Sequence, residues 1–155
     1  MKIMMVCLGN ICRSPMAEGI MRAKIEKYKL DAFVDSAGFE PFHTGDQPDY
    51  RAISTMKQHG IDISMQRSRI FQKSDFETFD RIYVMDERNY TDVKSVSQKQ
   101  DHLLKVDYIL NVLDPGSNKA VPDPYYGGEE GFRKVYHLLD SATELLALEL
   151  KNGGK

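Results

Sequence analysis

A cysteine and an arginine separated by five residues constrain this chain more than any other feature of its sequence. Cys7 and Arg13 bound the loop CLGNICR, and an apolar run, Ile3–Val6, precedes it. The run predicts a buried strand. The following Ser14-Pro15 predicts a helix with Ser14 as N-cap and Pro15 as its first residue. A loop between the carboxyl end of a strand and a helix N-terminus gathers unpaired backbone N–H groups, so the sequence predicts an anion-binding loop.

The expected anion is the phosphate group of an ester. Its oxygens can accept from the backbone amides of residues 8–13, and the planar guanidinium of Arg13 can bind two of them. A helix N-terminus and neighbouring donors lower the pKa of a cysteine from about 8.5 to roughly 3.5–7.5, so Cys7 is predicted to attack phosphorus as a thiolate. Ser14 is expected to donate a hydrogen bond to that thiolate. The residues of this loop predicted to bind substrate are Leu8, Gly9, Asn10, Ile11, Cys12 and Ser14.

The same loop has a simpler interpretation. A cysteine after an apolar strand is commonly a small buried hydrophobic residue, and the spacing to Arg13 also arises by chance. The loop lacks the Gly-Lys-Ser/Thr ending of a nucleotide-binding loop, so ATP or GTP is not indicated. The catalytic interpretation therefore requires a second chemical group elsewhere in the chain.

A second motif, VPDPYYGG, begins at Val121. Expelling an alkoxide or phenoxide from phosphorus requires a proton from a nearby acid. Asp123 stands between two prolines with fixed φ angles, which makes it the best-placed candidate acid. Tyr125 and Tyr126 are expected to flank a flat aromatic group of the substrate. The alternative is a turn in which the aspartate binds only its own backbone and the tyrosines cover the edge of the core.

Four segments together resemble the low-molecular-weight protein tyrosine phosphatases. They read CLGNICRSPMAE, DSAGFEPFHTGDQPDYRA, DFETFDRIYVMD and VPDPYYGG, in the family's order and across nearly the whole chain. The resemblance implies a nucleophilic Cys7, a phosphate clamp at Arg13, and a proton donor at Asp123 that later activates water. It further implies that Asn10, Ser14 and Ser36 brace the loop, and that Phe42, Tyr125 and Tyr126 form aromatic pocket walls.

One segment departs from the family pattern. Many relatives carry a histidine that joins the loop-bracing network where this chain has Met65, and Arg67-Ser68-Arg69 replaces the usual Ala-Arg-Gln. Methionine cannot supply the histidine's hydrogen bond, so Asn10 is expected to be supported differently, with water as one option. The cluster Arg67–Arg69 is expected to be a solvated loop face, with docking of acidic protein substrates as the weaker alternative.

The cysteine count separates related functions. Arsenate reductases with the same loop relay a disulfide through additional cysteines, and this chain has only Cys7 and Cys12. Arsenate reduction is therefore a minor alternative. A phosphopeptide-binding or redox-sensing module without turnover is disfavoured because Cys7, Arg13 and Asp123 are all present. Cys12 either forms a reversible disulfide that protects Cys7 or simply fills the back of the loop.

Composition agrees with a small enzyme. With 155 residues, 41% of them hydrophobic, the chain is expected to form one domain over residues 1–155. Two cysteines and no apparent leader segment indicate a cytoplasmic location. A formal net charge of −2 favours neither nucleic acid nor membrane as partner. The four histidines show no ligand spacing, so no metal or other cofactor is expected. A monomer acting on phosphotyrosine-containing proteins is expected, and a bacterial tyrosine kinase is one candidate substrate.

Strand and helix patterns alternate along the chain, which predicts a parallel sheet covered by helices on both faces. Ligands of such sheets bind at the carboxyl ends of the strands. The family resemblance implies four strands, that is, a three-layer α/β/α fold with the phosphate-binding loop after strand 1. Asp86 is expected to line the same sheet edge in a structural role. The predicted helices are 15–29, 49–59, 73–79, 87–95 and 129–150, the other strands are 33–36 and 81–85, and 103–113 is ambiguous between strand and helical turn.

Overall fold

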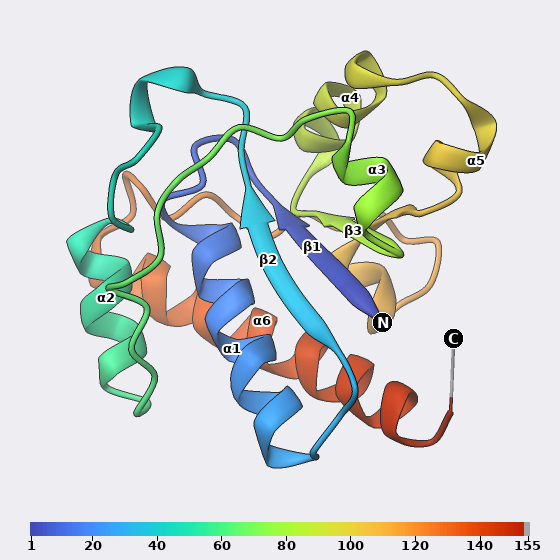
Figure 1. Ribbon diagram of the computed structural model, residues 1–155. Coiled ribbons are helices and arrows are strands. Elements are labelled where there is room, and N and C mark those ends of the chain that lie inside the picture. The colour runs from blue at the N-terminus through green and yellow to red at the C-terminus, as the bar shows by residue number, and fades with distance from the viewer. Residues whose placement is uncertain (154–155) are drawn as a thin grey trace.

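The computed structural model, described here for residues 1–153, contains a central parallel sheet (Figure 1). Its strand order is β2-β1-β3-β4. The strands are β1 (Lys2–Val6), β2 (Phe33–Ala37), β3 (Arg81–Val84) and β4 (Val106–Tyr108). All neighbouring pairs are parallel. The predicted α/β class with four parallel strands is confirmed.

Helices cover both faces of this sheet. The longer ones are α1 (Arg13–Lys27), α2 (Tyr50–Lys57), α4 (Glu87–Val96) and α6 (Gly128–Lys151). The shorter ones are α3 (Asp75–Thr78) and α5 (Gln100–Leu103), and two 3₁₀ turns occupy Pro41–His43 and Ile109–Val112. In Figure 1, α1, α2 and α6 lie against one face, and α3, α4 and α5 lie on the other side.

The alternation of side chains along β1 explains the three layers. Ile3 and Met5 belong to the core shared with α1 and α6, whereas Met4 and Val6 belong to the core shared with Phe76 and its neighbours. These four side chains are fully buried, whereas Lys2 at the start of β1 is exposed. A strand buried on both faces reads as a continuous apolar run, which is why the sequence identified it. Burying each such side chain contributes roughly 1.5–3 kcal/mol.

The start of α1 differs from the prediction. The helix begins at Arg13 with Cys12 in the N-cap position, two residues before the predicted start. Pro15 is tolerated there because N–H groups in the first turn have no partner inside the helix. The Ser14 N–H faces the sulfur of Cys7 at 3.4 Å. Ser14 therefore is not the N-cap: its hydroxyl and its N–H both face Cys7 instead of capping the helix.

The ambiguous region 103–113 contains both predicted conformations, because β4 is followed directly by the 3₁₀ turn Ile109–Val112. Helix α5 was not predicted: four residues are too few for a helical period to show in the sequence. Among residues 1–153, no helix combines the length and apolar character that crossing a membrane requires.

Candidate active site

A cavity of about 260 Å³ opens at the carboxyl edge of the sheet. It lies where the loop after β1, the segment after β2 and the segment before α6 meet. Its lining combines two thiols, one guanidinium, one imidazole, two carboxylates and several aromatic or aliphatic side chains. The lining residues are Cys7, Leu8, Gly9, Ile11, Cys12, Arg13, Glu40, Phe42, His43, Asp123, Tyr125 and Tyr126. Of the predicted site residues, Asn10 and Ser14 lie outside this lining, behind the loop.

The backbone of the Cys7–Arg13 loop has its carbonyls engaged with the surrounding protein. Leu8 O accepts from the N–H groups of Phe39 (2.7 Å) and Glu40 (3.1 Å), and Ile11 O accepts from Asp49 N–H at 2.8 Å. The N–H groups of residues 8–13 find no protein acceptor anywhere in the described residues 1–153. Six consecutive donors are thus free for an anion at the start of α1, where the helix dipole also favours negative charge.

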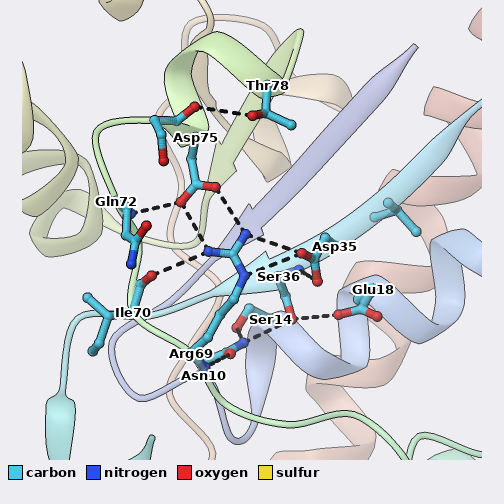
Figure 2. A network of polar contacts seen from close by, with 12 residues as sticks. Asn10, Ser14, Glu18, Asp35, Ser36, Arg69, Ile70, Gln72, Asp75 and Thr78 are labelled. Carbon is cyan, nitrogen blue, oxygen red and sulfur yellow. Dashed lines mark hydrogen bonds and ion pairs between the residues drawn. The ribbon is translucent and has the colours of Figure 1, made fainter.

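Asn10 holds the shape of this loop from behind. Its φ of 56° lies in the left-handed region, which costs energy for a residue with a side chain. Its side-chain amide donates to Ser14 Oγ (2.7 Å) and Ser36 Oγ (2.9 Å), and its Oδ1 accepts from Arg69 N–H at 3.1 Å (Figure 2). Ser36 Oγ in turn donates to the buried carboxylate of Glu18 at 2.6 Å. Every polar atom of the Asn10 side chain therefore has a partner.

Asn10 is supported without a histidine, as expected, because direct contacts with Ser14, Ser36 and the Arg69 N–H hold it. Met65 is 82% exposed and takes no part in this network. The expectation that Arg67–Arg69 forms a solvated loop face is wrong, because Ser68 is buried and donates to Gly9 O at 3.1 Å. The pattern misled because two arginines in three residues resemble a surface run, while tertiary packing turns the second inward.

Cys7 lines the cavity and is 3% exposed. Its Sγ is 2.9 Å from Ser14 Oγ. Since Ser14 Oγ already accepts from the Asn10 amide, its own hydroxyl hydrogen is available for the sulfur. The Ser14 N–H approaches the same sulfur. The hydroxyl and the N–H of Ser14 are therefore both placed to donate to the sulfur.

Arg13 is buried beside the thiol, with 3% of its surface exposed. Its Nη1 donates to Asp86 Oδ2 at 2.7 Å and to Val121 O at 3.0 Å. Burial lowers the pKa of Arg13, but the nearby Cys7 and the carboxylate of Asp86 outweigh it, so the net direction is upward. Asp86 has the structural role expected of it, because its Oδ1 also caps α4 by accepting from Asn89 N–H at 2.9 Å.

Asp123 makes the turn contact that the sequence offered as one alternative, and it also lines the cavity. Its Oδ1 accepts from Tyr125 N–H at 3.1 Å, which is the turn contact. Its Oδ2 lies 3.9 Å from Arg13 Nη2, facing the cavity that Cys7 shares. The side chain is half exposed, so water and a substrate oxygen can both reach it.

The aromatic residues form the mouth of the cavity. Phe42 is 71% exposed and Tyr126 is 94% exposed, while Tyr125 is more covered and has the Arg51 guanidinium 5.2 Å from its ring centre. Exposed rings around a narrow opening can contact a flat substituent on either side. Glu40 also lines the mouth, and sequence reasoning missed it, although it lies in the same segment as Phe42.

Cys12 is a free thiol, as is Cys7, and both are buried. Burial raises the pKa of the Cys12 thiol, and the charges of Asp49 and Cys7 act in the same direction. Cys12 is therefore held protonated at neutral pH. In the part of the chain that the structure describes, no cluster of three or more histidine, cysteine or acidic side chains could hold a metal ion.

Free amides, a buried thiol and a buried guanidinium meet at the edge of the sheet where α/β proteins bind ligands, which defines a protein that binds a phosphoryl group. Known proteins agree with this class. The model of the family described as low molecular weight phosphotyrosine protein phosphatase matches residues 2–155. The chain belongs to this family, and it is a phosphatase.

Three relatives illustrate the likeness. The low molecular weight phosphotyrosine protein phosphatase of Schizosaccharomyces pombe is 40% identical over 149 residues, which cover 94% of each chain. A crystal structure of a protein tyrosine phosphatase from Entamoeba histolytica matches with a TM-score of 0.91 at 38% identity, covering 99% of this chain and 98% of that one. The arginine phosphatase YwlE, solved as a cysteine-to-serine mutant with a phosphorylated active-site serine, matches with a TM-score of 0.87 at 26% identity, covering 97% and 96%.

Proposed function

We propose that this chain hydrolyses phosphotyrosine in proteins through a cysteinyl-phosphate intermediate. The observation that carries the proposal is the loop itself: the backbone amides of residues 8–13 have no protein acceptor in the described chain, and Cys7 and Arg13, at the two ends of this loop, line the same cavity. The serine-bound phosphate in the related arginine phosphatase supports covalent transfer to the side chain at this place in the family.

In the first step, the amides of residues 8–13 and Arg13 bind the three phosphate oxygens that do not react. The Cys7 thiolate attacks phosphorus in line with the ester oxygen, and the P–O bond to tyrosine breaks as the S–P bond forms. The departing phenolate oxygen takes a proton from the carboxyl group of Asp123. The products are tyrosine, a cysteinyl-phosphate and the Asp123 carboxylate.

In the second step, the Asp123 carboxylate takes a proton from a water molecule as the water oxygen attacks phosphorus. The S–P bond breaks and Cys7 leaves as a thiolate, which the Ser14 hydroxyl at 2.9 Å stabilises by a hydrogen bond. Inorganic phosphate departs, and Asp123 is again protonated. Asn10 supports both steps by holding Ser14 and the loop in place.

Depth favours a tyrosine substrate. Cys7 is buried whereas Phe42 and Tyr126 are largely exposed, so we expect a phosphate group to reach the sulfur on a spacer as long as a phenyl ring, for which phosphoserine is too short. The rings of Phe42, Tyr125 and Tyr126 stand where they would contact that phenyl group. Leu8 and Ile11 add an apolar lining that offers no hydrogen bond to a charged spacer.

Phosphoarginine is a second candidate substrate, because the Glu40 carboxylate lines the same cavity and could pair with a guanidinium. A relative is named an arginine phosphatase. The ratio of kcat/KM for a phosphotyrosine peptide and a phosphoarginine peptide decides between them. We expect the ratio to favour phosphotyrosine, and replacement of Glu40 with glutamine to leave the phosphotyrosine rate unchanged.

We further propose a single domain over residues 1–155 that acts as a cytoplasmic monomer on phosphotyrosine-containing proteins, a bacterial tyrosine kinase being one candidate. Two free thiols in the active site support a reducing compartment. Nucleic acid and membrane are not proposed as partners, and no metal or other cofactor is proposed for the reaction.

The function is tested with p-nitrophenyl phosphate in EDTA. Cys7→Ser should abolish turnover and leave the binding of inorganic phosphate largely intact, since the amides and Arg13 remain. Asp123→Asn should lower kcat/KM, which reports the first step, by about 10²–10⁴-fold for phenyl phosphate, the magnitude of lost general acid catalysis. The loss should be smaller for p-nitrophenyl phosphate, whose leaving group needs less protonation. Equal losses for both esters contradict the role of Asp123, and turnover by Cys7→Ser contradicts the proposed function.

A further inference from the structure

The guanidinium of Arg69 joins two carboxylates behind the active-site loop. Its Nη1 and Nη2 donate to the two oxygens of Asp75, each at 3.1 Å, in a bidentate contact. Its Nε and Nη2 donate to Asp35 Oδ2 at 3.3 Å and 3.2 Å. Asp75 is the first residue of α3, and Asp35 lies on β2 (Figure 2). One side chain thus connects a helix, a strand and its own segment.

The main chain of the same residue contacts the loop. Arg69 N–H donates to Asn10 Oδ1 at 3.1 Å, and Arg69 O accepts from Gly38 N–H at 2.9 Å. Ser36 directly follows Asp35 in the chain, and its hydroxyl oxygen accepts from Asn10 Nδ2, at the other end of the Asn10 amide. Arg69 therefore fixes both sides of the Asn10 side chain, directly through its N–H and indirectly through Asp35.

We propose that Arg69 is a positioning residue for the nucleophile. This proposal rests on the proposed function. The guanidinium holds the backbone of residues 68–70 against the loop, and Asn10 transmits that position to Ser14, which contacts the Cys7 sulfur at 2.9 Å. Arg69 contacts neither substrate nor the reacting atoms, so it acts through Asn10.

The charges support a fixed contact. Burial lowers the pKa of Arg69, and the hydrogen bond and charge of Asp75, together with Asp35, outweigh it, so the net direction is upward. Asp75 is itself buried and also accepts from Gln72 N–H at 2.8 Å, which leaves it little freedom to move. A planar guanidinium can donate two parallel hydrogen bonds to one carboxylate, as Arg69 does to Asp75, and an ammonium group cannot.

The chain offers a matched control two residues away. Arg67 is exposed, and its side chain donates only to the backbone carbonyls of Ser64 and Gln66. Arg67→Gln removes the same charge from the same segment as Arg69→Gln. Lys24 is a second control, because it pairs with two carboxylates on α6, far along α1 from the loop. Lys24→Gln tests whether loss of any two-carboxylate contact has the same effect.

The experiment compares Arg69→Gln, Arg69→Lys and the two controls by three measurements: kcat/KM for p-nitrophenyl phosphate, the melting temperature Tm, and protection of Cys7 by inorganic phosphate against iodoacetate. A displacement of the loop by about 1 Å costs about 10²-fold in rate, so Arg69→Gln should lower kcat/KM by roughly ten- to a hundredfold. Phosphate protection should weaken with it. Arg69→Lys should recover only a minor part, and the controls should match the wild type in activity and protection.

The proposal is overturned if Arg69→Gln equals Arg67→Gln in activity and in phosphate protection. It is also overturned if Lys24→Gln loses as much activity as Arg69→Gln at the same Tm. Phosphate protection requires no turnover, so it tests Arg69 even if the wild type fails to hydrolyse phosphotyrosine, a result that would refute only the proposed function. If Arg69→Gln does not fold, Asp35→Asn removes the charge of one of the two carboxylates that hold Arg69. Weaker phosphate protection in that variant supports the proposal, and unchanged protection overturns it.

Discussion

Replacing Gly38 with alanine should damage the active site without touching any residue that reacts. Gly38 follows β2 and lies directly against the Cys7–Arg13 loop. A Cβ atom there would be 2.9 Å from three atoms of the loop: Asn10 Cβ, Asn10 N and Leu8 O. Gly38 has no positive φ, so alanine suits its backbone conformation and the effect is purely steric.

The expected loss follows from that distance. Carbon atoms that are not bonded are most stable at about 3.5–4.0 Å, so the loop and residue 38 must separate by about 0.6 Å. Because a displacement of about 1 Å costs about 10²-fold in rate, we expect kcat/KM to fall on the order of ten- to thirtyfold. This corresponds to about 1.4–2 kcal/mol of lost transition-state stabilisation. Overpacking should also lower the free energy of unfolding by roughly 1–3 kcal/mol.

Two other glycines provide the same chemical change elsewhere. In Gly19→Ala, on α1, the new Cβ would lie 2.5 Å from the side chain of Ile63, so this variant overpacks the core and leaves the loop backbone alone. In Gly131→Ala, on α6, the nearest atoms are at 3.6 Å, an ordinary contact. Alanine inside a helix is favoured over glycine by about 0.5–1 kcal/mol, so Gly131→Ala should be neutral or slightly stabilising.

The assay measures kcat/KM for p-nitrophenyl phosphate well below the Tm of each variant, together with the free energy of unfolding in urea. Gly38→Ala should lose far more activity than Gly19→Ala for the same loss of stability. Equal losses of activity at equal stability would show that general destabilisation explains the result. Wild-type activity in Gly38→Ala would show that the loop does not depend on this close contact, and would refute the steric argument.

Three further predictions concern charges and thiols around the site. In Asp86→Asn the amide oxygen can keep the α4 cap, but the amide nitrogen then replaces the oxygen that accepts from Arg13, so urea unfolding should show a loss of about 1–2 kcal/mol, and no loss would contradict the contact. Although burial raises the pKa of Asp49, the Arg51 hydrogen bonds outweigh it and hold that pKa below its usual 3.8. The difference in the free energy of unfolding between wild type and Asp49→Asn should therefore be present above about pH 3.8 and vanish as the pH falls through the lowered pKa of Asp49 in the folded protein. Urea unfolding at several pH values measures this difference, and a difference that grew on acidification would contradict the prediction. Because burial raises the pKa of Cys12, iodoacetate should leave it unlabelled at neutral pH in Cys7→Ser protein, as mass spectrometry would show; rapid labelling would contradict this.

Local sequence determined the elements and much of the cavity. The run Ile3–Val6 is apolar at every position because both faces of β1 are buried, and that pattern needs no knowledge of other segments. Cys7 and Arg13 are joined by a short loop before a helix, so their closeness follows from chain connectivity. The motif around Asp123 was recognisable because its residues are also neighbours in the chain. The 3.9 Å distance between Asp123 Oδ2 and Arg13 Nη2 could not be predicted, because 110 residues separate the two in the sequence.

The tertiary structure alone decided how the loop is supported. Asn10 is held by Ser36 and Arg69, which are 26 and 59 residues away, and no periodicity or local motif links positions so far apart. The same cause turned Arg69 inward while Arg67 stayed exposed, although the two arginines look alike in the sequence. Propensity and pattern act over a few neighbouring residues, whereas the partner of a charged side chain depends on which segments packing brings together. The reacting groups were therefore visible in the sequence, and the family resemblance already implied that Asn10, Ser14 and Ser36 brace the loop, whereas the support from Arg69 appeared only in the tertiary structure.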